Sequence, residues 1–137
     1  MALFRRKRDP ATPPPVEPPA DYKARRSAAR AERERVKALA DAGEVEAAAV
    51  AALALLDDVK ALNAEDPETR SVGAGNPAHA PALDYYRDAA VLLRKAGRHA
   101  DEVTLLEDML ADPGITYSHE KWAGDRLPRA RTLRDAD

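Results

Sequence analysis

The side chains most suited to catalysis or metal binding are few in this chain and stand far apart. The chain has no cysteine and three histidines, His79, His99 and His119, each twenty residues from the next. A metal site would need histidines and carboxylates at short spacings such as H-E-x-x-H, and no such spacing occurs. We therefore expect surface histidines, no metal, no cofactor and no thiol chemistry.

Patterns for phosphate binding or nucleophilic catalysis are also missing. The segment Gly73-Ala74-Gly75 lacks the Gly-Lys-Ser or Gly-Lys-Thr that completes a phosphate-binding loop, and no serine has the flanking glycines of a nucleophile elbow. Carboxylates are abundant, but at helical spacings they normally pair with arginine or lysine. The sequence therefore predicts a protein that is not an enzyme.

The N-terminal tip is the one segment whose composition has a purpose other than folding. Leu3 and Phe4 stand before four consecutive cations, Arg5, Arg6, Lys7 and Arg8. Such a tip suits an anionic membrane surface, at about 1 kcal/mol per basic residue, or a nucleic acid backbone. A solubilising tail without a ligand is the alternative, and all three interpretations stay open.

Proline separates this tip from the rest of the chain. Six of the eleven prolines fall within residues 10–19, where they remove amide donors and fix φ. Asp9 and Pro10 stand where a secretory signal would need an apolar segment. We predict a disordered arm over residues 1–21 and one helical domain over residues 22–137.

Apolar side chains recur at helical spacing in that domain, most clearly within residues 44–62. Gly43 and Gly97 are expected to end helices, and Ser118 is expected to be an N-cap. Pro128 predicts that the last helix is kinked or divided in two. The predicted elements are a hairpin over 22–63, a loop over 64–81, a hairpin over 82–112 and a C-terminal helix over 118–135. Since no segment alternates with period two, we expect an all-α fold.

Composition describes the core and the charge of this domain. Alanine supplies 30 residues of the chain, which favours helices but buries little surface, so we expect a thin core.

Residues 1–36 carry 10 basic and 5 acidic side chains, whereas residues 37–112 carry 7 basic and 15 acidic ones. A basic end on an acidic body argues against nucleic acid binding by the body itself.

The segments around Gly43 and Gly97 match in kind, and the second resembles the tetratricopeptide repeat. In residues 83–113, Tyr86 stands at the large aromatic position of that repeat and Ala90 at its small position. Further equivalents are Leu93, Gly97, Leu106 and Pro113. The resemblance implies paired antiparallel helices that stack on their neighbours and serve as a protein-binding scaffold. It transfers no functional residue.

Several positions depart from the repeat. Glu102 and Met109 stand where small residues are expected, and the repeat geometry places Glu102 at a helix interface, where pairing with arginine is the predicted role. The first unit keeps Ala48 at the small inter-helix site but has Glu32 and Val36 where an aromatic and a small residue are expected. The two glycines are 54 residues apart rather than 34, so the 64–81 loop is interpreted as an insertion.

The aromatic side chains of the domain have two interpretations. Tyr85, Tyr86, Tyr117 and Trp122 either pack in the core or anchor a partner peptide in a groove beside the hairpins. The predicted function is a non-enzymatic protein–protein interaction module. The alternative is a self-associating structural subunit, for example a small phage or bacterial accessory protein, attached to a membrane or nucleic acid by its tip. We expect a cytoplasmic location, with the membrane periphery as the alternative.

Overall fold

The computed structural model describes residues 21–65 and 80–137, and within them the chain forms five α-helices. They are α2 (Tyr22–Asp41), α3 (Val45–Glu65), α5 (Ala80–Lys95), α6 (His99–Leu110) and α7 (Tyr117–Ala136). No strand occurs in these two ranges, so the predicted all-α class is confirmed. Residues 1–20 of the predicted arm and residues 66–79 of the predicted loop lie outside the described residues.

Two glycines make the tight turns that join α2 to α3 and α5 to α6. Gly43 has φ +83° and Gly97 has φ +75°, a left-handed conformation that only glycine adopts without cost. Both turns have the same hydrogen bonds: the amide after the glycine donates to the carbonyl five residues earlier, at 2.9 Å in each case. The predicted helix ends at both glycines are confirmed, and each glycine folds one helix back on the other.

The helix bounds differ from the predicted ones at several ends, most clearly beside the predicted loop and at the start of the last helix. Helix α3 continues to Glu65, and α5 already begins at Ala80, so both extend into the range predicted as loop. Helix α7 begins at Tyr117 with Thr116 at its N-cap, not Ser118. Pro128 lies inside α7, and the helix continues to Ala136, so the alternative of two short helices is wrong.

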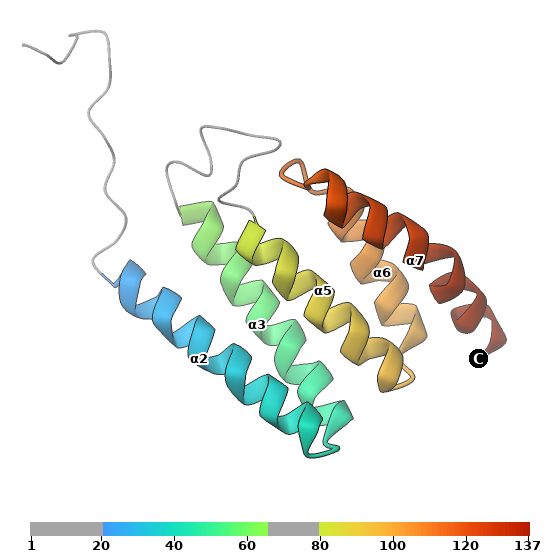
Figure 1. The fold of residues 1–137 in the computed structure, drawn as a ribbon, viewed down its shortest axis with the longest axis horizontal. Helices are drawn as coiled ribbons and strands as arrows, with labels where there is room; N and C mark the ends of the chain where they lie inside the picture. The colour runs from blue at the N-terminus through green and yellow to red at the C-terminus, as the bar shows by residue number, and fades with distance from the viewer. Residues whose placement is uncertain (1–20, 66–79) are drawn as a thin grey trace, which may run out of the picture.

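The helices form two layers (Figure 1). Packing follows the order of the chain, since α2 contacts α3, α3 contacts α5, α5 contacts α6 and α6 contacts α7. Helices α2, α5 and α7 lie side by side in the layer nearer the viewer, and α3 and α6 lie behind them. The packed pairs α2–α3 and α5–α6 are compatible with the two predicted helical hairpins.

The core between the layers is rich in alanine. Of the 24 buried apolar side chains in the described residues, nine are alanine, which lets neighbouring helices approach closely. The larger anchors include Tyr86, Leu93, Leu106 and Met109, all within 1% of full burial. Methyl groups bury little area each, so these few large side chains provide a large share of the hydrophobic stabilisation.

One carboxylate is buried within this core. Glu102 of α6 is 0% exposed, and its two oxygens accept hydrogen bonds from Arg94 Nε of α5 at 2.9 Å and Arg126 Nε of α7 at 2.6 Å. The predicted pairing of Glu102 with arginine is confirmed. A buried charge needs such partners, and here they join three helices.

Candidate functional site

The charged side chains divide by layer. Helices α2, α5 and α7 together carry 15 basic and 8 acidic side chains, whereas α3 and α6 together carry 1 basic and 8 acidic. The formal charge of the first layer is therefore +7 and that of the second −7, with histidine neutral. Successive helices of the chain alternate between the two layers. The division of charge between the layers is therefore not the same as the division between the basic N-terminal part and the acidic middle part of the sequence.

A groove runs along the basic layer between α2 and α5. It consists of two adjoining cavities of about 300 and 310 Å³ that share Arg33 in their walls. The first is lined by Arg33, Val36, Lys37, Ala40, Asp41, Arg87, Asp88, Val91 and Leu92. The second is lined by Arg26, Ala29, Arg30, Arg33, Val59, Asp84 and Tyr85. Grooves of this kind, apolar with a few polar groups, are common ligand sites.

The two cavities differ in chemistry. The first has an apolar floor in which Val36 and Leu92 are buried and Ala40 and Val91 are half-buried. The second carries three arginines of α2, at positions 26, 30 and 33, which stand at i, i+4 and i+7 and therefore on one side of the helix. We call these two parts the apolar half and the basic half of the groove.

The arginines of the basic half are unequally neutralised. Among the described residues, Arg26 donates to two neutral oxygens, Tyr22 Oη at 3.0 Å and Asn63 Oδ1 at 2.5 Å, and to no carboxylate. Arg30 is exposed, contacts Ser27 Oγ at 3.4 Å, and has no carboxylate partner among the described residues. Two cations in this half of the groove are therefore available to an anionic group.

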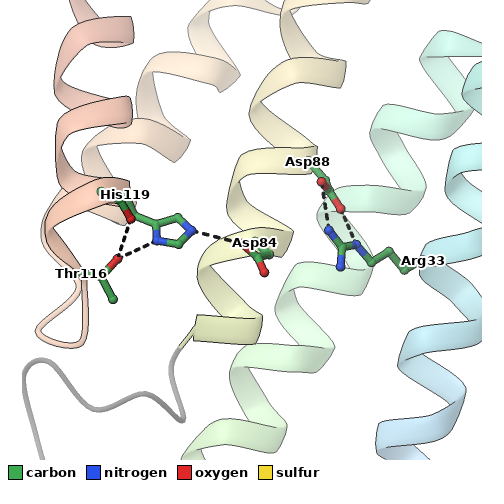
Figure 2. A network of polar contacts seen from close by, with 6 residues as sticks. Arg33, Asp84, Asp88, Thr116 and His119 are labelled. Carbon is green, nitrogen blue, oxygen red and sulfur yellow. Dashed lines mark hydrogen bonds and ion pairs between the residues drawn. The ribbon is translucent and has the colours of Figure 1, made fainter.

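Arg33 stands where the two halves meet and is already paired. Its Nε donates to Asp88 Oδ2 at 2.7 Å, joining α2 to α5 (Figure 2), and its guanidinium lies 5.2 Å from the centre of the Tyr85 ring. The hydrogen bond with Asp88 raises the pKa of Arg33 above its ordinary value, so it stays charged. The pair therefore links the two walls of the groove.

A second polar cluster joins α5 to α7. His119 Nε2 lies 3.1 Å from Asp84 Oδ1, and His119 Nδ1 lies 2.7 Å from Thr116 Oγ1 (Figure 2). The order hydroxyl, imidazole, carboxylate is that of a nucleophilic triad. A structural role explains it equally well, since Thr116 is the N-cap of α7 and His119 is three residues into that helix. The cluster holds Asp84 at the wall of the basic half.

The aromatic residues predicted as partner anchors take different places. Tyr86 is 1% exposed and Tyr85 6% exposed, so both belong to the core, although Tyr85 also forms part of the wall of the basic half. Trp122 is half-buried between the guanidinium groups of Arg87 and Arg126, at 5.1 and 5.2 Å. Tyr117 is 81% exposed at the start of α7. The four rings therefore do not form one anchor site.

The hydroxyl of Tyr86 belongs to a polar contact between three helices. It donates to Asp108 Oδ2 at 2.6 Å, and Lys60 Nζ donates to the same oxygen at 2.9 Å. Burial, and then the hydrogen bond with Asp108, raises the pKa of Tyr86 to about 12. The same contacts raise the pKa of Lys60 and lower the pKa of Asp108, in each case first through a hydrogen bond. This contact joins α3, α5 and α6 and lies outside the groove.

The remaining predicted site lies beyond the described residues. Arg5, Arg6, Lys7 and Arg8 fall within residues 1–20, so their role as anionic-surface contacts stays a prediction. Within residues 21–65 and 80–137, no group of histidine and carboxylate side chains could hold a metal ion. Over the same ranges, no helix is long and apolar enough to cross a membrane.

Sequence reasoning missed the groove, although part of its signal was present. Arg26, Arg30, Arg33 and Lys37 recur at the spacing of one helix face, which indicates a basic stripe. The second wall comes from α5, more than fifty residues later in the chain, and no sequence pattern relates the two.

Comparisons with known proteins give no relative from which a role could be transferred. No family model matches the chain, no curated protein matches it, and no solved structure matches it.

Proposed function

We propose that the protein is a non-enzymatic protein–protein interaction module that binds a partner segment in the groove between α2 and α5. The observation that carries the proposal is the composition of this groove: an apolar half beside a basic half in which Arg30 has no carboxylate partner among the described residues. A segment with an apolar side chain and nearby carboxylates would complement both halves.

The hairpins support the proposal at the level of architecture. We propose that they are tetratricopeptide-like units, because both turn at a left-handed glycine with the same hydrogen bonds, and because Tyr86 and Ala90 are buried at the predicted packing positions. Such units present one layer of helices as an extended binding surface.

The charges within the groove favour a protein partner over nucleic acid. Asp41, Asp84 and Asp88 line it together with the cations, and their carboxylates would repel a phosphate backbone. A protein segment can place carboxylates beside Arg26 and Arg30 and avoid the aspartates.

Affinity capture from the native host with a matched pair of variants tests the proposal. Arg30→Glu changes the groove, and Arg35→Glu makes the same charge change on the same helix outside both cavities. We expect a protein captured by the wild type and by Arg35→Glu, and lost with Arg30→Glu. Equal capture by both variants, or capture that nuclease treatment abolishes, would contradict it.

A further inference from the structure

The outer side of α3 has a surface that complements the two halves of the groove. Val50 is 53% exposed and is flanked by exposed Ala47 and Ala54, so an apolar side chain stands in the middle of this surface. Asp57 and Asp58 follow within the same helix, both exposed, and neither has a cation partner among the described residues. The acidic layer therefore offers an apolar anchor and two free carboxylates on one helix.

The spacing on α3 matches the spacing along the groove. Val50 and Asp57 are seven residues apart, about 10 Å along a helix axis. On α2, Lys37 of the apolar half and Arg30 of the basic half are also seven residues apart. A helix that places Val50 in the apolar half can therefore place Asp57 beside Arg30.

We propose that α3 of a second copy of this chain lies in the groove, antiparallel to α2, with Val50 in the apolar half and Asp57 and Asp58 beside Arg30 and Arg26. This inference rests on the proposed use of the groove as a binding site and names its occupant. The antiparallel direction follows from charge, because the parallel one would carry both aspartates past Asp41 at the end of α2, where like charges repel.

The contact joins different surfaces of the two copies. The copy that contributes its α3 still has an empty groove. The copy whose groove is occupied still has a free α3. Association is therefore heterologous and continues from copy to copy, basic layer against acidic layer, instead of closing as a symmetric dimer. Because the ion pairs lie at an exposed surface, added salt weakens the association.

Sedimentation of charge-reversed variants tests this assignment. We expect the mass of the full chain to rise above the 14.9 kDa of the monomer as concentration increases from micromolar to millimolar. Arg30→Glu alone and Asp57→Arg alone should each remain monomeric, because each places like charges across the contact. An equimolar mixture of the two variants should associate again, since the carboxylate introduced at position 30 of one chain can then face the guanidinium introduced at position 57 of the other.

Two controls separate this contact from misfolding and from other surfaces. Arg35→Glu should associate as the wild type does, and circular dichroism should show equal helix content in all variants. Val50→Ser should weaken association without loss of helix, because Val50 is 53% exposed in the monomer.

Three results would overturn the inference. They are a wild type that stays monomeric at every concentration, single variants that associate as the wild type does, and a mixture that fails to regain mass. None of them affects capture of a different protein by the groove, so failure of this inference and failure of the proposed function are distinguishable.

Discussion

Glu102 and Arg126 form a 2.6 Å ion pair between α6 and α7 in which the carboxylate is 0% exposed. Arg94 of α5 takes the other oxygen at 2.9 Å. The arginines are 19% and 26% exposed, so only the carboxylate depends entirely on its partners for the hydrogen bonds that water would supply.

Removing that carboxylate should destabilise the fold strongly. Glu102→Gln leaves two arginines facing each other without a counter-charge, and the expected loss is about 3 kcal/mol of unfolding free energy, measured by urea denaturation. Glu107→Gln on the same helix is the matched control, because its 3.3 Å pair with Arg131 is half exposed and contributes under about 1 kcal/mol. Equal losses in the two variants would mean that the buried pair does not hold the three helices together.

Stability should fall at alkaline pH because of Tyr86 and Lys60. The pKa of Tyr86 is about 12 in the fold against 10.0 ordinarily, so the fold keeps a proton that the unfolded chain loses. The contribution of Tyr86 to the free energy of unfolding is therefore complete below about pH 10 and is lost as the pH rises toward about 12. The pKa of Lys60 is also raised, so Lys60 changes stability in the same direction.

Tyr86→Phe tests this assignment. It removes the hydrogen bond to Asp108, which should lower stability near neutral pH by about 1 kcal/mol and reduce the alkaline loss. Tyr117→Phe, at an 81% exposed position, should leave both unchanged. Urea midpoints across the alkaline range measure the difference, and an alkaline loss of wild-type size in Tyr86→Phe would argue against it.

The left-handed glycine at the second turn should be intolerant of a side chain. Gly97→Ala should lower the free energy of unfolding by about 1 kcal/mol, because alanine is strained at a positive φ. Steric contact plays no part, since an added Cβ would meet no atom within 4 Å. Gly124→Ala, inside α7 and equally unobstructed, should gain about 0.5–1 kcal/mol. Thermal melts of both variants test this: the melting temperature should fall for Gly97→Ala and rise for Gly124→Ala.

Leu106→Ala should be among the most damaging core substitutions. Leu106 and Leu93 are both 0% exposed in the same core, and truncation should cost about 2–5 kcal/mol in a urea melt. Val50→Ala, at a half-exposed position, should cost far less. An unchanged midpoint for Leu106→Ala would remove the support for packing between α5 and α6.

The basic tip is predicted to carry any attraction to anionic membranes. Replacement of Arg5, Arg6, Lys7 and Arg8 by alanine should sharply reduce co-sedimentation with anionic liposomes, and so should high salt. Binding that survives the substitution would place the membrane contact elsewhere in the chain.

Local features of the sequence were enough to predict the helices. Apolar spacing within residues 44–62 predicted α3, and Gly43 and Gly97 predicted the two tight turns, because helical periodicity and left-handed glycine geometry depend on neighbouring residues only. The ends were less accurate where propensity alone had to decide, as at Ser118 and Pro128: Thr116 takes the N-cap, and α7 continues through the proline.

Tertiary structure decided the pairings and the groove. Repeat geometry predicted that Glu102 meets an arginine, but which arginines depends on α5 and α7 arriving on either side of α6. The groove likewise needs Arg33 beside Asp88, 55 residues later. Charge separation follows from the same cause. Residues distant in sequence form one basic layer because alternate helices lie side by side in the fold (Figure 1), and no local pattern in the sequence determines that arrangement.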